Sequence, residues 1–163
     1  MRTFKPGARL GDAQRAVTAT FANRVRDVDL LFFAVGTNDL GKLSREEFIT
    51  AFRELLGVAR VAAPHAVIAF SSIIPRPRDH EITGPMILVI NADLKRLCQE
   101  RDVWFVDTFD LFTHRGSPKR NLFQDGIHLA QAGVRRLKDF LRQQLNDGNV
   151  RRWLQQHASV DEE

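Results

Sequence analysis

The sequence predicts one α/β domain of three layers, in which helices cover both faces of a parallel sheet. Short apolar runs typical of buried strands alternate along the chain with segments whose apolar residues recur at helical spacing. The helical segments are roughly ten residues or longer, the length that connects parallel strands. The 163 residues are 44% hydrophobic and 27% charged, which is enough apolar side chain for a core.

The first half of the chain predicts two helices and a strand. Residues 13–25 can form a helix with Asp12 as N-cap. Residues 28–36, VDLLFFAVG, are almost continuously apolar and end at a glycine, which is typical of a strand buried on both faces. Ser44 and Glu47 stand at the spacing of a capping box and predict a second helix. Its apolar stripe consists of Phe48, Phe52, Leu55, Leu56 and Ala59.

The second half repeats the alternation. Residues 66–72, AVIAFSS, predict a buried strand that leads into the proline-rich loop IIPRPRDH, and Pro85 marks the start of a helix. A third strand is expected from Val103, and a last helix follows the QDGIH loop. The apolar stripe of the Pro85 helix is Ile87, Ile90, Leu94, Leu97 and Cys98, and that of the last helix is Val134, Leu137, Leu141 and Leu145. From about residue 146 the chain is polar with one anchor, Trp153, and we expect its acidic end to fray.

Composition and charge set limits on the class of protein. The net charge of +4 and the pI near 9.8 permit weak attraction to nucleic acid, but the basic residues are scattered, which favours a solvated surface. The single cysteine, Cys98, forms no internal disulfide and suits a reducing compartment. The chain contains no signal peptide and no apolar run of membrane-spanning length, so we expect an intracellular, cytoplasmic protein without a membrane partner.

Polar clusters follow each predicted strand, at the end of a parallel sheet where functional sites form. In GTNDL, Asn38 could donate an N–H to a developing oxyanion, or it could bond its own backbone in an Asx-turn. In QDGIH, Asp125 stands three residues before His128. It could hold one ring nitrogen of His128 and leave the other as a base, although Asp-Gly is also an ordinary turn signal.

GTND and DGIH, in this order and about 90 residues apart, resemble the third and fifth sequence blocks of the SGNH (GDSL-type) hydrolase family. The loop IIPRPR and the pattern Ile90-Asn91-x-x-Leu94 resemble esterase domains encoded by retrotransposons. The resemblance implies a flavodoxin-like sheet over residues 1–147, followed by a polar extension at 148–163. It also implies ester hydrolysis through an acyl-enzyme, with a small-molecule ester as substrate. The five histidines are dispersed without ligand spacing, and no phosphate loop or dinucleotide fingerprint occurs, so we expect no metal and no cofactor.

The resemblance assigns a role to each matching residue. His128 would be the general base, Asp125 its orienting partner and Asn38 an oxyanion donor. A second oxyanion donor, the backbone N–H of a glycine, would be supplied by Gly7, with Gly11 as the alternative. A plain loop explains these two glycines equally well.

The family's first block, a strand ending in Gly-Asp-Ser that supplies the nucleophile, is absent from the sequence. We therefore expect a domain truncated at its N-terminus that lacks the first strand and hydrolyses esters weakly or not at all. The lost neighbour would leave an apolar strand edge prone to self-association. Ser71 and Ser72 are weak substitutes for the nucleophile, since a polar strand end bonding to its own loop explains them better. Cys98 lies on an apolar stripe and is expected to fill the core.

A different function class remains open, namely a non-catalytic interaction module derived from a mobile-element esterase. Binding of nucleic acid would require the basic residues of the two loops to form one face and would weaken steeply with salt. Those residues are Arg76, Arg78, Arg115, Lys119 and Arg120.

Overall fold

The computed structural model describes residues 7–22 and 28–148, and this part of the chain falls into two compact units. The first unit comprises the described residues of Met1–Ile73 and Pro85–Asp107. The second comprises those of Ile74–Gly84 and Thr108–Glu163. The polar extension with its predicted anchor Trp153 lies outside the described residues, apart from Gly148.

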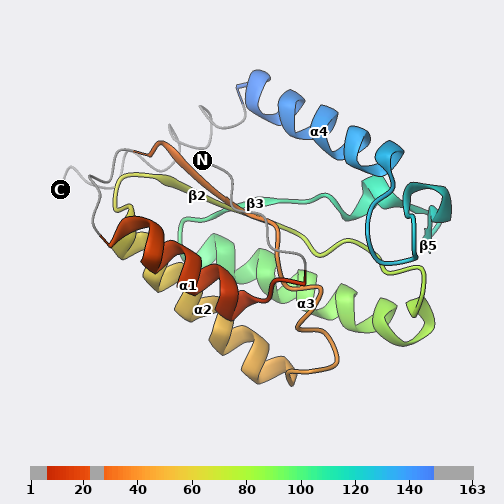
Figure 1. Ribbon diagram of the computed structural model, residues 1–163, viewed down its shortest axis with the longest axis horizontal. Coiled ribbons are helices and arrows are strands. Elements are labelled where there is room, and N and C mark those ends of the chain that lie inside the picture. Colours follow the sequence, from red (N-terminus) through yellow and green to blue (C-terminus); the bar gives the residue numbers. More distant parts are fainter. Residues whose placement is uncertain (1–6, 23–27, 149–163) are drawn as a thin grey trace. The chain divides into compact units, whose positions relative to one another are not determined.

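A parallel sheet forms the centre of the first unit. Its strands are β1 (Leu30–Phe33), β2 (Val67–Ser71) and β3 (Trp104–Val106), in the order β1-β2-β3 (Figure 1). Each strand pairs with the next in parallel, and all five residues of β2 are buried. The predicted α/β class with a parallel sheet is therefore confirmed.

The prediction that the strand within residues 28–36 is buried on both faces is wrong. β1 covers only four of the residues 28–36, its side chains are mostly half-buried, and Phe32 is 37% exposed. In the described part of the chain β1 pairs with β2 on one side only. An apolar run alone does not distinguish an edge strand from a central one, because both can be continuously hydrophobic.

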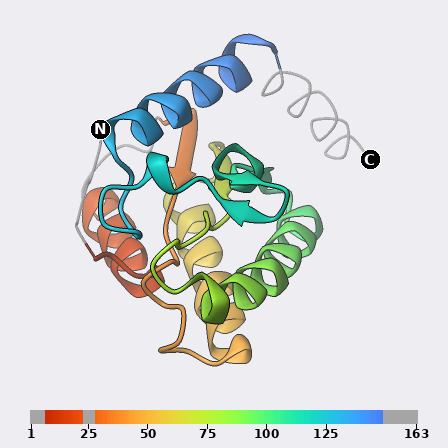
Figure 2. The ribbon, with the colours of Figure 1, turned by 90° about the vertical axis from the view of Figure 1, so that its right-hand side faces the viewer.

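Helix α2 (Arg45–Ala62) forms as its sequence predicts. The Ser44 hydroxyl accepts a hydrogen bond from the Glu47 N–H at 3.2 Å, and the Glu47 carboxylate accepts one from the Ser44 N–H at 2.7 Å. The predicted stripe is buried, and the Phe52 ring meets Phe70 of β2 edge-on at 4.8 Å between centroids. Figures 1 and 2 show α1 (Leu10–Phe21), α2 and α3 (His80–Glu100) along the same side of the strands.

Helices α1 and α3 both begin earlier than predicted. Asp12 is not the N-cap of α1 but its third residue, and its carboxylate accepts a hydrogen bond from the Arg9 N–H at 3.1 Å. Pro85 lies inside α3 rather than at its start, and the Asp79 carbonyl accepts the first helical bonds. A proline early in a helix removes one backbone bond, and the carbonyl left over belongs to exposed Glu81, where water can reach it. The predicted stripe of α3 is buried.

The second unit packs around three buried side chains, those of Phe112, Leu122 and Phe123. The ring centroids of Phe112 and Phe123 lie 5.9 Å apart. Partly buried Ile74, Leu111, Leu129 and Leu137 pack against them. Its described residues form two 3-10 helices, a short hairpin and helix α4, together with the first turn of α3. Their bounds are η1 (Phe109–Phe112), β4 (Thr113–His114), β5 (Ser117–Pro118), η2 (Arg120–Leu122) and α4 (Gln131–Asn146).

Helix α4 corrects another prediction, because its apolar stripe is not turned fully inward. Leu137 packs against the small core, but Val134 is 38% exposed and Leu145 is 49% exposed. The helix approaches its unit through Gly133, where a Cβ would lie 2.3 Å from the Leu122 carbonyl oxygen. The small core covers α4 at Gly133 and Leu137 and leaves Val134 and Leu145 partly exposed.

Candidate active site

A short closed loop of the second unit carries Asp125 and His128. Phe123 and Leu129 form an antiparallel bridge at its ends, and the Gln124 N–H donates to the His128 carbonyl at 3.0 Å. Gly126 adopts a positive φ of 78° within the loop, a conformation that favours glycine. The Asp-Gly pair is therefore a turn signal, as the sequence indicated, and the turn brings Asp125 and His128 together.

Asp125 uses both carboxylate oxygens to hold this turn. One oxygen, Oδ2, lies 2.5 Å from Nδ1 of His128. The other, Oδ1, accepts hydrogen bonds from the backbone N–H groups of Ile127 at 2.9 Å and His128 at 2.7 Å. The bond to the His128 ring, followed by the two backbone bonds, holds the pKa of Asp125 well below its ordinary value. Asp125 is thus an anionic acceptor that fixes the His128 ring by its Nδ1 edge.

The other edge of the ring remains accessible. The His128 side chain is 58% exposed, and its Nε2 atom has no hydrogen-bond partner among residues 7–22 and 28–148. A ring whose Nδ1 donates to a carboxylate keeps Nε2 as an acceptor. This arrangement can remove a proton from a bound hydroxyl, which is the chemistry of a general base.

Arg78 ties this loop to the proline-rich loop of the same unit. Its backbone N–H donates to the Gly126 carbonyl at 3.0 Å, and its Nε donates to the Asp125 carbonyl at 3.1 Å. A Cβ on Gly126 would lie 2.9 Å from both the backbone nitrogen and the Cβ of Arg78. Sequence reasoning placed Arg78 only in a basic face, because no local pattern reveals a bond across 47 residues.

The neighbouring arginine is held differently. Arg76 forms a two-pronged ion pair with Asp79, with distances of 3.0 Å from Nε and 2.7 Å from Nη2. The Thr83 hydroxyl, in the first turn of α3, donates to the Asp79 side chain at 3.0 Å. The charge of Arg76 is therefore balanced within the loop, and the loop itself is fixed on both sides of Arg78.

The candidate oxyanion donors lie in the first unit. The Asn38 side-chain amide donates to the Ala8 carbonyl at 3.0 Å, and Gly7, just before Ala8, has a positive φ of 72°. The structure thus brings the Gly7 loop to the loop after β1. The bond to Ala8 is not the local backbone bond of an Asx-turn. Gly11 lies in the first turn of α1 instead.

Two further residues explain the shape of the loop after β1. Gly36 has a φ of 120°, and a Cβ there would lie 3.0 Å from the Phe48 ring. Asp39 is buried, and its carboxylate accepts the Leu10 N–H at the start of α1 at 3.0 Å. Burial raises the pKa of Asp39, while the bond from Leu10 opposes that change. Sequence reasoning missed Asp39, although an acidic residue is a suitable partner for a helix N-terminus.

Ser71 and Ser72 are buried at the end of β2, with exposures of 5% and 4%. The Ser71 hydroxyl donates to the Ser72 carbonyl at 3.1 Å, and the Ser72 hydroxyl lies 3.4 Å from an Asp107 carboxylate oxygen. These contacts favour the structural role of a polar strand end over that of a nucleophile, because an attacking hydroxyl has to reach a substrate.

Asn91 of α3 is a residue whose structural role sequence reasoning missed. Its side-chain oxygen accepts the Ile73 N–H at 2.8 Å, and its amide donates to the Ile73 carbonyl at 2.9 Å. The Asn91 side chain thus bonds both backbone groups of Ile73 just after β2 ends, as a neighbouring strand would. The sequence showed Asn91 only as part of a family-like pattern.

Cys98 is fully buried, and burial raises the pKa of its thiol to about 12, so it belongs to the core. Within the described ranges no three His, Cys, Asp or Glu side chains come together as metal ligands. Nor does any helix of those ranges combine the length and hydrophobicity needed to cross a bilayer.

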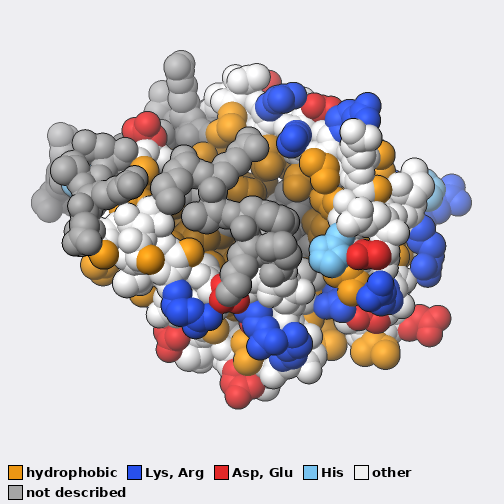
Figure 3. All heavy atoms as spheres, viewed as in Figure 1, with side chains coloured by type: hydrophobic (Ala, Val, Ile, Leu, Met, Phe, Trp, Pro, Cys, Tyr) orange, Lys and Arg blue, Asp and Glu red, His pale blue; other side chains and the backbone are white. Residues whose placement is uncertain are grey.

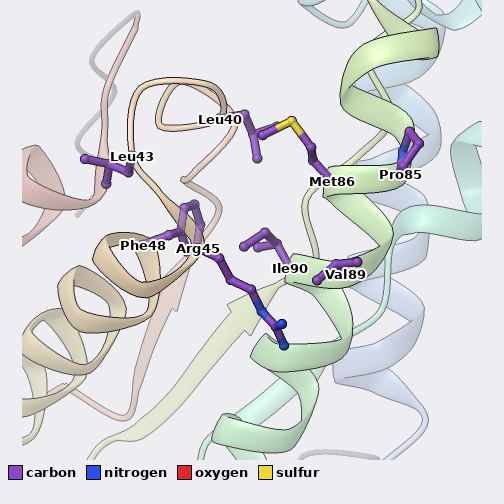
Figure 4. A pocket seen from close by; sticks show the side chains of 8 residues that line it. All are labelled: Leu40, Leu43, Arg45, Phe48, Pro85, Met86, Val89 and Ile90. Atoms are coloured by element: carbon purple, nitrogen blue, oxygen red, sulfur yellow. The ribbon is translucent and has the colours of Figure 1, made fainter.

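An apolar pocket of about 300 Å³ lies in the first unit between the loop after β1, the start of α2 and α3 (Figure 4). Leu40, two residues beyond Asn38, forms one wall, and Met86 faces it from α3 (Figure 4). Arg45 lines the pocket, and its guanidinium pairs with Asp93 at 2.7 Å. The other lining residues are Leu43, Phe48, Pro85, Val89 and Ile90. The pocket is suited to an uncharged group.

The sequence comparison identifies the family. Residues 4–136 match the model of the GDSL-like lipase/acylhydrolase family, so the chain belongs to that family. No curated protein matches the chain.

Solved structures agree with this assignment. The esterase domain of an ORF1 protein from a zebrafish retrotransposon is 28% identical, with a TM-score of 0.56 over 89% of this chain and 87% of that domain. A structure from Streptococcus pneumonia is 27% identical, with a TM-score of 0.69 over 83% of this chain and 69% of its own. A GDSL-like lipase from Bacteroides thetaiotaomicron, 16% identical, shares the fold with a TM-score of 0.70, covering 87% of this chain and 73% of that one. The resemblance to a retrotransposon esterase domain is thereby confirmed.

Proposed function

We propose that this chain is an acyl hydrolase domain acting on carboxylic esters, with His128 as its general base and Asp125 as the residue that orients His128. The observation that carries the proposal is the Asp125 carboxylate on Nδ1 of a ring whose Nε2 has no partner among the described residues. In a histidine base of this kind the carboxylate fixes the tautomer and stabilises the imidazolium that forms. Membership of an acylhydrolase family supports the same reaction.

The reaction that the family resemblance implies is acyl transfer to a hydroxyl followed by hydrolysis. Nε2 of His128 takes the proton of a hydroxyl nucleophile as that oxygen attacks the ester carbonyl. The carbonyl oxygen becomes an oxyanion. From the family resemblance alone, N–H groups of Asn38 and Gly7 are proposed as donors to it. The tetrahedral intermediate collapses, His128 protonates the departing alcohol, and water attacks the acyl group in the same way to regenerate the hydroxyl.

The hydroxyl nucleophile is the part that this sequence does not assign. Gly-Asp-Ser does not occur in it, and Ser71 and Ser72 are buried. Removing one member of a catalytic triad leaves only about 10³–10⁴-fold acceleration over water. We therefore propose that this chain hydrolyses esters slowly: Nε2 of His128 takes a proton from a water molecule, and that water attacks the ester carbonyl in place of the missing hydroxyl.

The apolar pocket suggests which esters fit. Its volume of about 300 Å³ is about twice that of the ~150 Å³ cavity that holds benzene, so a chain on the order of ten carbons fills it. Because Leu40 follows Asn38 so closely, we propose that the pocket holds the apolar part of the ester. KM should fall along p-nitrophenyl esters from acetate to decanoate, and Val89→Phe should remove that trend.

Hydrolysis of p-nitrophenyl acetate by the purified protein tests the proposal. We expect a slow rate that falls to background in His128→Ala, while His114→Ala, an exposed histidine on β4, keeps the wild-type rate. Ser71→Ala and Ser72→Ala should also keep it. A wild-type rate in His128→Ala would refute the proposal, and a loss in either serine variant would identify that serine as the nucleophile.

Binding of nucleic acid has less support. Of the five loop cations, Arg76 is paired with Asp79, Arg78 bonds the Asp125 carbonyl, and Lys119 donates to the Leu111 carbonyl at 3.3 Å. Figure 3 shows Lys and Arg side chains interspersed with Asp and Glu on the face in view. Affinity for a single-stranded oligonucleotide that falls steeply with salt would favour this function. Self-association through the β1 edge stays a prediction.

A further inference from the structure

We propose that Arg78 is a positioning residue for His128, acting through the loop that carries the Asp125–His128 pair. The proposal rests on the proposed function, since it gives Arg78 a role only if His128 acts as a base. Arg78 would not touch the substrate. It would hold the backbone from which Asp125 reaches His128.

The first support is where the Arg78 bonds lie. Its Nε–H and backbone N–H donate to two successive carbonyls, those of Asp125 and Gly126. Asp125 is the residue whose carboxylate holds Nδ1 of His128 and the N–H groups of Ile127 and His128. Two bonds to adjacent peptide units restrict rotation of the backbone at Asp125, and that rotation would swing the carboxylate away from the ring.

The second support is the close approach at Gly126. A Cβ at this position would lie 2.9 Å from the backbone nitrogen of Arg78 and 3.1 Å from its Cα. The two loops therefore meet with no room for a side chain on Gly126. Contact this close between segments far apart in the sequence is consistent with one fixed arrangement of the turn.

The third support is the way Arg78 itself is fixed. Arg76 and Thr83 both bond Asp79, the residue after Arg78, so the chain on that side is braced. Arg78 has no carboxylate partner within residues 7–22 and 28–148. The guanidinium of its neighbour Arg76 forms an ion pair with Asp79, whereas the side chain of Arg78 donates to the loop that carries Asp125 and His128. Lysine cannot reproduce this geometry, because it lacks the planar Nε–H donor.

Nuclear magnetic resonance of the whole protein tests the role of Arg78 without relying on hydrolysis. Two quantities are followed: exchange of the His128 Nδ1 proton with water, and titration of the Asp125 carboxyl group. Arg78→Ala removes the side-chain bond and keeps the backbone bond to Gly126, so the protein should fold. Arg78→Lys keeps the charge, and Arg53→Ala removes an exposed arginine of α2 as the matched control.

In Arg78→Ala the Nδ1 proton should exchange roughly three- to tenfold faster, the effect of losing one hydrogen bond. The pKa of Asp125 should rise toward its ordinary value. Arg78→Lys should behave like Arg78→Ala, Gly126→Ala should shift both quantities in the same direction, and Arg53→Ala should match the wild type. Unchanged exchange and titration in Arg78→Ala would overturn the proposal.

The outcome is separable from that of the proposed function. If His128→Ala hydrolyses esters like the wild type while Arg78→Ala still alters both resonances, the function fails and the contact between Arg78 and the loop stands. If His128→Ala abolishes hydrolysis and Arg78→Ala alters neither resonance, the function stands and the role of Arg78 is refuted.

Discussion

Asn38 donates its side-chain N–H to the carbonyl of Ala8 at 3.0 Å, across 30 residues of sequence. This bond joins the loop after β1 to the loop that holds Gly7, and the Asp39 carboxylate reinforces the junction by accepting the Leu10 N–H at 3.0 Å. The two segments for which family resemblance implied oxyanion donors thus meet within the first unit.

Replacing Asn38 tests this junction. Asn38→Ala should lower the free energy of unfolding by about 0.5–1.5 kcal/mol, the net value of one hydrogen bond. If Asn38 also serves as an oxyanion donor, the His128-dependent rate should fall roughly 100-fold, far more than the stability change explains. Urea unfolding and the p-nitrophenyl acetate assay measure the two effects. Asn121→Ala, at an exposed position in η2, is the control. Loss of stability with an unchanged rate would leave Asn38 a purely structural residue.

The Asp125 carboxylate predicts a pH dependence of stability. Its pKa is lower in the folded protein than its ordinary value, so the bonds to His128 and Ile127 contribute stability above about pH 4. That contribution is lost as the pH falls through the folded pKa. Asp125→Asn should therefore be less stable than the wild type at pH 6, with the difference shrinking toward pH 2. Urea unfolding across this range measures it. A constant difference at every pH would show that the carboxylate charge is not involved.

Two glycines should respond oppositely to alanine. Gly36→Ala places a Cβ 3.0 Å from the Phe48 ring at a φ of 120°, so it should destabilise the protein by about 1–3 kcal/mol. Gly57→Ala lies within α2 with nothing inside 4 Å of the added Cβ, and it should stabilise by roughly 0.5–1 kcal/mol. Thermal unfolding of both variants measures whether each substitution stabilises or destabilises the protein. Equal effects would contradict the close approach at Gly36.

Cys98 should be unreactive in the native protein. It is fully buried, and a thiol whose pKa is about 12 holds almost no thiolate at neutral pH. A thiol reagent such as Ellman's reagent should label Cys98 only when denaturant is added. The rate of labelling should then equal the rate at which the protein unfolds. Rapid labelling of the native protein would mean that α3 opens locally, and it would contradict the full burial of Cys98.

The sequence predicted most of the first unit correctly, because its signals are local. The Ser44–Glu47 capping box and the buried stripe of α2 depend on helical spacing, and both are present. The apolar run of β2 predicts a buried strand, and all five of its residues are buried. From its apolar run β1 was predicted to be buried on both faces, and this was wrong because face burial depends on which elements pack over the sheet. α3 begins before Pro85 because the Asp79 carbonyl accepts the backbone N–H groups of Ile82 and Thr83, and no local pattern indicated these bonds.

The candidate site was predictable only where its partners are close in sequence. Asp125 and His128 are three residues apart, and the structure joins them. The bonds of Arg78 to Asp125 and of Asn91 to Ile73 span 47 and 18 residues, and no local pattern reveals them. The Asn38–Ala8 bond was approached only through family resemblance, which placed Gly7 and Asn38 in one site without giving the contact.

The most direct test of the central claim compares ester hydrolysis by Asp125→Asn, His128→Ala and the double variant. If Asp125 acts only by orienting His128, each single variant should lose the wild-type rate, and the double variant should be no slower than His128→Ala, because residues acting as a unit are not additive. Circular dichroism would confirm that each variant is folded. Hydrolysis by Asp125→Asn at the wild-type rate, or separate losses that add up in the double variant, would contradict the account.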